Sequence, residues 1–207
     1  MKTLKWVLAA MAVSLMAACG GSGNAGVSPF SSSGCSGASA ASGVACSTAA
    51  TSVDVLASAV QVGTGGDTVT ISAVVKGSNN VALAGVPVTF AATSGNLTGV
   101  SALTNASGLA TATFTAGADR SNRQSTVTVR SGSANGSIVL DIVGTVLSYT
   151  GVTTVPLNGV ATLPVKVVDS RGTPISGFGV SVASSLGNGL STNSLLTDSL
   201  GNAAVTY

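Results

Sequence analysis

The sequence predicts an all-β protein that contains two consecutive β-sandwiches after an N-terminal export segment. From residue 51 onward, apolar and polar residues alternate in short segments, and the same run of segments occurs twice. Aromatic residues make up only 3% of the chain and charged residues 7%, so a core must be built from many small β-branched side chains, which favours strands. Beyond the export segment, no helical periodicity extends over more than two turns.

Each expected strand places its apolar side chains on one face. In the stretch DTVTISAVVK, the residues expected to face the core are Val69, Ile71, Ala73 and Val75. In the later segments, the inward positions are Val86, Val88 and Phe90; Ala110, Ala112 and Phe114; Val127 and Val129; and Ile138, Leu140 and Ile142. Turn residues such as Gly77-Ser78-Asn79-Asn80 bound these segments. Many short strands at this spacing are typical of a β-sandwich.

Two copies of one module are visible in the alternating region. The alignment, with one inserted residue between its two blocks, pairs residues 69–90 with 161–182 and 103–114 with 196–207. We therefore expect one sandwich over residues 51–144 and a second over 145–207. The first copy continues past Phe114 with two further strands that the second lacks, so the second sandwich is expected to be incomplete. Either the sequence is the N-terminal part of a longer protein, or a partner supplies the strands.

Residues 1–18 have the features of a secretion signal. Lys2 and Lys5 precede an apolar run that ends at Ala18 and is too short to span a bilayer. An ordinary cleavage site prefers small residues at both −3 and −1, and Met16 fits the −3 position poorly. An ordinary signal peptide whose first mature residue happens to be cysteine nevertheless remains the alternative to the interpretation that follows.

The stretch LMAAC, residues 15–19, resembles the lipobox of bacterial lipoproteins. The resemblance implies that the thiol of Cys19 carries a diacylglycerol and that the signal is cut before this residue. Lipoproteins of that family retained in the inner membrane typically carry Asp after the cysteine, whereas this chain has Gly20. The resemblance therefore implies a membrane partner, reached through the N-terminal lipid, and location at the outer membrane, facing either the periplasm or the outside.

Residues 19–50 combine the expected lipidated cysteine with a segment rich in Gly, Ser and Ala that shows no periodicity. Such a composition predicts a flexible linker that holds a folded body away from a lipid surface. Cys35 and Cys46 lie within it. Because the compartment after export is oxidising, we expect a disulfide between them, with free or intermolecular thiols as the alternative.

The charge pattern excludes nucleic acid as a partner. Two of the eight basic residues are in the signal segment, so six bases and six acids remain in the rest of the chain and its formal charge is zero. A protein that binds nucleic acid carries a basic patch or stripe instead.

Catalysis has little support in the sequence. The chain has no His, which excludes Ser-His-Asp and Cys-His arrangements. The six acids are all Asp and are scattered over both copies, so a carboxylate pair for glycoside hydrolysis is not expected. The run Gly63-Thr64-Gly65-Gly66 opens no helix and is predicted to be a loop rather than a phosphate site. We expect no enzyme activity, no cofactor and no metal.

Two polar features have a structural and a functional interpretation. Four aspartates lie at expected turns, where carboxylate and carbonyl oxygens could bind calcium: Asp67, Asp119, Asp169 and Asp198. For Asp169 and Asp198, capping of an Asx turn is the simpler explanation. The segment DRSNR, residues 119–123, with Arg120 and Arg123, is predicted to be a solvated loop between strands, and an interdomain or ligand contact is its functional alternative.

The stretches VVKGSNNVALAGVPVTF and LTNASGLATATFTAG resemble the bacterial immunoglobulin-like domains of group one, found in intimins and invasins. The second copy has VVDSRGTPISGFGVSV and LTDSLGNAAVTY in the same places. The shared marks are a polar turn, a Gly-Val-x-Val strand start, and Thr-Asp/Asn-x-x-Gly-x-Ala before a last alternating strand. The resemblance covers residues 51–207 and implies tandem immunoglobulin-like sandwiches, the second incomplete.

Domains of that family serve as rigid spacers and adhesin stalks, so the resemblance implies a structural envelope lipoprotein. Its partners would be a surface ligand or a neighbouring Ig-like module. An adhesin that binds host or neighbouring-cell ligands through its loops is the alternative. A hydrolase whose catalytic domain lies beyond residue 207 is a third hypothesis.

Overall fold

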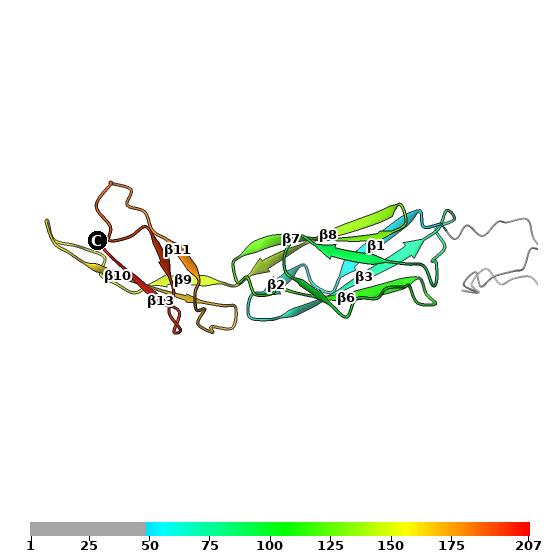
Figure 1. The fold of residues 1–207 in the computed structure, drawn as a ribbon, viewed down its shortest axis with the longest axis horizontal. Coiled ribbons are helices and arrows are strands. Elements are labelled where there is room, and N and C mark those ends of the chain that lie inside the picture. Colours follow the sequence, from blue (N-terminus) through cyan, green and yellow to red (C-terminus); the bar gives the residue numbers. More distant parts are fainter. Residues whose placement is uncertain (1–48) are drawn as a thin grey trace, which may run out of the picture. The chain divides into compact units, whose positions relative to one another are not determined.

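A computed structural model describes residues 49–207, and its regular elements are β-strands joined by turns and loops (Figure 1). Within this range, no helix combines the length and the apolar character needed to cross a bilayer. The all-β prediction is therefore confirmed. The predicted signal peptide, the lipidated Cys19 and the cysteines Cys35 and Cys46 lie outside the described residues.

We call residues 51–144 module 1, drawn from cyan to yellow-green in Figure 1. Its strands form two four-stranded sheets, with the orders β1-β3-β6-β5 and β2-β8-β7-β4. All pairs are antiparallel except β2 with β8. In chain order the strands are β1 (Ser52–Ala57), β2 (Gln61–Gly63), β3 (Thr68–Lys76), β4 (Thr89–Ala92), β5 (Asn96–Thr98), β6 (Leu109–Thr115), β7 (Arg123–Ser131) and β8 (Ala134–Val143).

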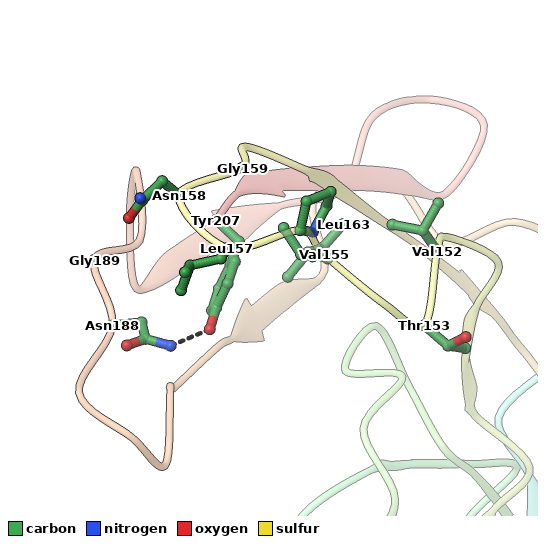
Figure 2. Close-up of a pocket in the computed structure, with 11 residues that line it drawn as sticks. Val152, Thr153, Val155, Leu157, Asn158, Gly159, Leu163, Asn188, Gly189 and Tyr207 are labelled. Atoms are coloured by element: carbon green, nitrogen blue, oxygen red, sulfur yellow. Dashed lines mark hydrogen bonds between the residues drawn. The ribbon is translucent and has the colours of Figure 1, made fainter.

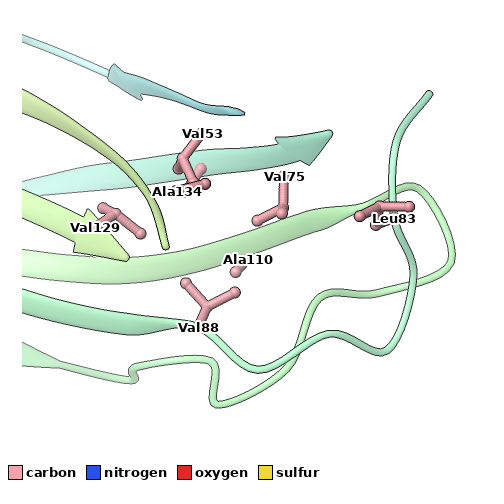
Figure 3. Packing of buried hydrophobic residues seen from close by; sticks show 8 residues of the cluster. Val53, Val75, Leu83, Val88, Ala110, Val129 and Ala134 are labelled. Carbon is pink, nitrogen blue, oxygen red and sulfur yellow. The ribbon is translucent and has the colours of Figure 1, made fainter. Parts of the chain in front are cut away.

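The core of module 1 is built from the residues that the alternation predicted. Along β3, the buried side chains are Val69, Ile71, Ala73 and Val75. They belong to two apolar clusters, one of which Figure 3 shows, with Val75 and Ala110 of one sheet facing Val88 and Val129. Small branched side chains thus fill the space between the sheets, as the low aromatic content requires.

We call residues 145–207 module 2, drawn from yellow to red in Figure 1. One sheet has the order β13-β10-β9, and β11 pairs with β12 in a second, two-stranded sheet. In chain order the strands are β9 (Val146–Tyr149), β10 (Thr162–Val168), β11 (Gly179–Ser181), β12 (Ser194–Leu196) and β13 (Asn202–Thr206). Among the described residues, no strand of module 2 takes the place that β7 and β8 occupy in module 1.

The two modules share a buried threonine that ties a strand to a turn. Thr104 donates its hydroxyl to the carbonyl oxygen of Leu83 at 2.6 Å and accepts the N–H of Val86 at 3.0 Å. Thr197 is the aligned residue of module 2. Its hydroxyl donates to the carbonyl oxygen of Ile175 at 2.5 Å and accepts the N–H of Phe178 at 2.8 Å. Each partner lies 92 positions from its counterpart, since 175 − 83 and 178 − 86 both equal 92, as the alignment of the first block requires.

Glycines with positive φ also recur at aligned positions. Gly108 and Gly201 have φ values of 71° and 75°, and each ends the turn that precedes a strand, β6 in module 1 and β13 in module 2. A Cβ atom at Gly108 would lie 2.7 Å from the Cβ of Ala82, so the position excludes larger residues by space as well as by conformation. The matched turns indicate that the two copies fold alike in this region.

Candidate functional site

The six Asp side chains are all engaged in structural contacts. Their partners are Lys76 for Asp54 (2.6 Å), Arg171 for Asp67 (2.5 Å), the Ser121 N–H for Asp119 (2.8 Å), Gln124 for Asp141 (3.0 Å), Arg120 for Asp169 (3.1 Å), and the N–H groups of Leu200 and Asn202 for Asp198 (both 2.8 Å). Asp169 and Asp198 cap turns, as the Asx interpretation predicted. In residues 49–207, no group of three or more His, Cys, Asp or Glu side chains is placed to hold a metal ion.

A polar junction joins module 1 to module 2, and Arg120 is its first element. The guanidinium Nη1 donates to the carbonyl oxygen of Thr64 at 2.5 Å and to Oδ2 of Asp169 at 3.1 Å. The Asp169 side chain is only 5% exposed, whereas that of Arg120 is 36% exposed. One cation therefore connects a loop of module 1 with a buried carboxylate of module 2.

Thr64 is the centre of the junction, and its side chain is fully buried. The Thr145 hydroxyl lies 3.0 Å from Thr64 Oγ1, and that oxygen accepts the N–H of Ser170 at 3.2 Å. The Thr145 hydroxyl is also hydrogen-bonded to the carbonyl oxygen of Arg120. Asn122 fixes Thr145 through two further bonds of 2.9 Å, one to its N–H and one to its carbonyl oxygen. Thr145, the first residue of module 2, is thus hydrogen-bonded to module 1 through both its side chain and its backbone.

The turn of module 2 that begins at Asp169 fits against a glycine-rich loop. The N–H of Gly65 donates to Ser170 Oγ at 2.8 Å, and a Cβ atom at Gly65 would lie 2.8 Å from the same oxygen. Arg171 adds an ion pair of 2.5 Å to Asp67, both of them exposed. Of the run predicted to be a loop, Thr64, Gly65 and Gly66 form a turn, whereas Gly63 is the last residue of β2. The small residues of this run let the turn of module 2 approach the backbone.

The charge state of Asp169 follows from its surroundings. Burial acts to raise the pKa of this carboxyl, but the N–H groups of Arg171 and Thr173 and the charge of Arg120 outweigh it and hold the pKa below the ordinary value of 3.8. Both N–H groups donate to Oδ1, at 2.9 and 3.0 Å. Asp169 is therefore a carboxylate at neutral pH and keeps its ionic contact with Arg120.

The interpretation of residues 119–123 as a solvated loop is wrong for its two arginine side chains. Arg120 makes the interdomain contact that was the alternative. Arg123 is 17% exposed and donates to Ser94 Oγ at 3.1 Å and to the Ala116 carbonyl oxygen at 2.8 Å. A guanidinium group has five N–H donors, so it satisfies several loop carbonyls at once. The sequence does not mark Thr64 or Ser170 as junction residues, because the residue types around them indicate no long-range contact of a hydroxyl group.

A concave feature lies in module 2 and has a volume of about 670 Å³ (Figure 2). Its wall includes Leu163 of β10 and Tyr207, together with Val155 and Leu157 from the loop before β10. Asn188 is hydrogen-bonded to the Tyr207 hydroxyl across one side. The lining consists of aliphatic, amide and phenol groups and the hydroxyl of Thr153, which suit apolar contacts and hydrogen bonds rather than proton transfer at neutral pH.

The comparisons with known proteins agree with this architecture. The family described as bacterial Ig-like domain (group 1) matches residues 52–143. Adhesin InvE of Yersinia pseudotuberculosis is similar at 20% identity with a TM-score of 0.50, over 74% of this chain and 50% of InvE. The chain thus spans about half the length of that structure. The D0-D1 domain of intimin matches at 30% identity with a TM-score of 0.38, over 74% of this chain and 82% of that one.

No curated protein matches the sequence. The evidence for the family is the match over residues 52–143, the two four-stranded sheets of module 1 and the turns repeated in module 2. Residues 52–143 of this chain therefore belong to the family of bacterial Ig-like domains of group 1.

Proposed function

We propose that this chain is a structural spacer of the bacterial envelope, in which two Ig-like modules joined by a polar junction extend from a lipid anchor at Cys19. The observation that carries the proposal is the junction itself. In it, Arg120 of module 1 donates to Asp169 of module 2, and the Thr64 hydroxyl oxygen of module 1 accepts the N–H of Ser170 of module 2. Arg120 also donates to the carbonyl oxygen of Thr64. A spacer needs joints that resist bending, whereas a flexible tether needs none.

The chemistry of the described residues supports a mechanical role. The Asp side chains all serve as acceptors in turns, strand pairs or the junction. Outside the signal segment, the chain has six bases and six acids, so it has no net charge to attract nucleic acid. The described residues therefore form β-sheets and a hydrogen-bonded junction, which suit a structural role.

The anchor is tested by metabolic labelling with an alkyne analogue of palmitate in a Gram-negative host. The wild-type chain is expected to incorporate the label and to appear in the outer-membrane fraction, while Cys19→Ala remains an unlabelled precursor. Cys35→Ala is the matched control, because it removes a linker thiol and leaves residues 15–19 intact. Label on the Cys19→Ala chain, or a mature N-terminus other than Cys19, contradicts the anchor.

Adhesion is the second candidate, and exposed aliphatic side chains at the loops of module 2 favour it. Leu157 is 95% exposed and Leu186 83% exposed, more than any other large apolar side chains in the described part. Such residues are suited to contact a ligand. Attachment of cells that carry Leu157→Ser and Leu186→Ser in place of the wild-type chain tests this function. Unchanged attachment, with equal amounts of protein at the surface, counts against it.

A further inference from the structure

Each module has a four-residue turn at the same place, residues 77–80 after β3 and residues 169–172 after β10. In both turns, the N–H of the first residue donates to the carbonyl oxygen of the fifth, and the N–H of the fourth donates to the carbonyl oxygen of the first, all at 2.9 Å. The fourth residue has a positive φ in each copy, 59° at Asn80 and 77° at Gly172. The two turns therefore have the same backbone, although one reads Gly-Ser-Asn-Asn and the other Asp-Ser-Arg-Gly.

Two side chains by which the turn of module 2 contacts module 1 have no equivalent in the turn of module 1. Asp169 and Arg171 align with Gly77 and Asn79, neither of which carries a charge. A second copy of module 1 in the place of module 2 would therefore offer neither ion pair of the junction. The serine between the two positions is common to both turns, so it does not distinguish them.

The two ion pairs of the junction have opposite directions. At one, module 1 supplies the cation, Arg120, to the carboxylate of Asp169 at 3.1 Å. At the other, module 1 supplies the carboxylate, Asp67, to the cation Arg171 at 2.5 Å. A turn with these charges exchanged would place like charges together at both positions, so the pattern selects its neighbour. The first pair carries most of the selection, because its carboxylate is buried and the second pair is exposed.

The remaining junction contacts do not separate the two modules. Thr145 stands directly before β9, and Thr51 stands directly before β1, so each module begins with a threonine at the same place. Ser170, whose hydroxyl oxygen accepts the N–H of Gly65, aligns with Ser78. The charged contacts at positions 169 and 171 are therefore what distinguishes a module 2 turn from a module 1 turn at this junction.

We propose that module 1 docks selectively to an Ig-like module whose turn carries Asp-Ser-Arg. The occupant is module 2 of the same chain, and a second copy of module 1 is not accepted. The selecting face of module 1 consists of Thr64, Gly65, Asp67 and Arg120. The inference rests on the proposed spacer function and deepens it, because a stiff joint then forms only with a matching neighbour.

Loss of docking is tested in the mature chain with Asp169→Gly and Arg171→Asn together. The turn should keep its backbone, because module 1 forms it with these same residues. Nitrogen-15 relaxation gives a rotational correlation time for each module, and the value for module 2 should fall about twofold from that of the wild type. Gly172→Asn is the matched control. It also copies module 1, but a Cβ atom there has open space around it, so the wild-type value should remain.

Gain of docking is tested in a chain in which a second copy of residues 51–144, joined after Gly144, replaces module 2. The two copies should have separate correlation times, because the second offers neither ion pair. Gly77→Asp with Asn79→Arg in the second copy should bring the two values together. Asn80→Gly in the second copy is the control. It alters the same turn without adding a charge, so the values should remain separate.

The outcomes separate this inference from the spacer function. Separate correlation times for the two modules of the wild type would overturn both. A wild type that turns as one body, with the same result for the Asp169→Gly and Arg171→Asn chain, would overturn the selectivity and leave the spacer function standing. A common correlation time in the unaltered two-copy chain would do the same. If the two-copy chain does not fold, the variants of the mature chain decide the matter.

Discussion

Arg120 Nη1 lies 3.1 Å from Asp169 Oδ2, although the two residues are 49 positions apart and belong to different modules. The Asp169 side chain is buried at 5% exposure and also accepts N–H groups from its own turn. The contact therefore combines a half-exposed cation with a carboxylate that is already fixed in space. Such a pair is stronger than two flexible surface charges, because only one side chain must be ordered.

Replacing Arg120 with Ala should weaken the support that module 1 gives to module 2. The change removes the donor to Thr64 and Asp169 and leaves the carboxylate without its cation, which should cost about 1–3 kcal/mol. Within the described residues, the two tyrosines, Tyr149 and Tyr207, both lie in module 2, so tyrosine fluorescence during urea unfolding reports on that module. The midpoint is expected at lower urea than in the wild type.

Arg130→Ala is the matched control for this measurement. Arg130 is also an arginine of module 1, but it is exposed on β7, and none of the junction bonds involves it. Its replacement should leave the tyrosine-monitored midpoint within experimental error. Equal shifts in the two variants would mean that the junction gives module 2 no particular stability.

Phe114→Ala should destabilise module 1 more than any surface change. The ring is fully buried and packs between the two sheets in one cluster with Leu140 and Ile142, so its removal leaves a cavity and should cost about 3–5 kcal/mol. Far-ultraviolet circular dichroism during urea unfolding measures the loss. Val139→Ala, on the outer face of β8, should change the free energy of unfolding by less than about 1 kcal/mol.

Thr104→Val isolates the value of the buried hydroxyl in module 1. Valine has nearly the same shape, but it leaves the Leu83 carbonyl oxygen and the Val86 N–H without their partner. The expected loss of stability is about 1–3 kcal/mol. Thr70→Val, at an exposed position of β3, is the control and should be close to neutral. A Thr104→Val protein as stable as the wild type would show that these backbone groups find other partners.

Acid should weaken the folded chain in a defined range. The pKa of Asp119 is lowered chiefly by the N–H of Ser121, and that of Asp198 chiefly by the N–H of Asn202; the pKa of Asp169 is also lowered, since its hydrogen bonds and Arg120 outweigh burial. A group whose pKa is lower in the folded state stabilises the fold above its unfolded pKa. This stability is lost as the pH falls below about 4 and through the lower folded values.

The measurement is the free energy of unfolding in urea between pH 7 and pH 2. It should be flat down to about pH 5 and then decline. Asp169→Asn should be less stable than the wild type at pH 7, and the difference should shrink at pH 2. A constant difference across that range would contradict the role given to the ionised carboxylate.

The strands of module 1 were predictable because alternation alone sets which side chains are inside. Val69 and Ile71 are buried as expected, while Val86 and Phe90 are only partly buried because they lie near the edges of the clusters. The repeat also predicted the turn geometry, since Gly85 and Gly177 share positive φ values of 70° and 68°. Local pattern therefore carries most of this fold.

The junction could not be predicted in the same way. Gly65 and Ser170 are 105 positions apart, and their contact depends on how one module is placed on the next. Neither residue has a side chain whose type indicates such a role. The arginine at position 120 gave the only hint, because its loop carries a local cluster of charge. Long-range polar contacts of this kind follow from the fold and not from the pattern along the chain.

The junction is expected to make the two modules turn as one body in solution. Nitrogen-15 relaxation of the mature chain in solution tests this directly, because it gives a rotational correlation time for each module. We expect the same correlation time for residues 52–143 and 162–206, well above that of a single domain of about 100 residues. Two separate, shorter correlation times would show that the modules turn independently, and the spacer function would lose its basis.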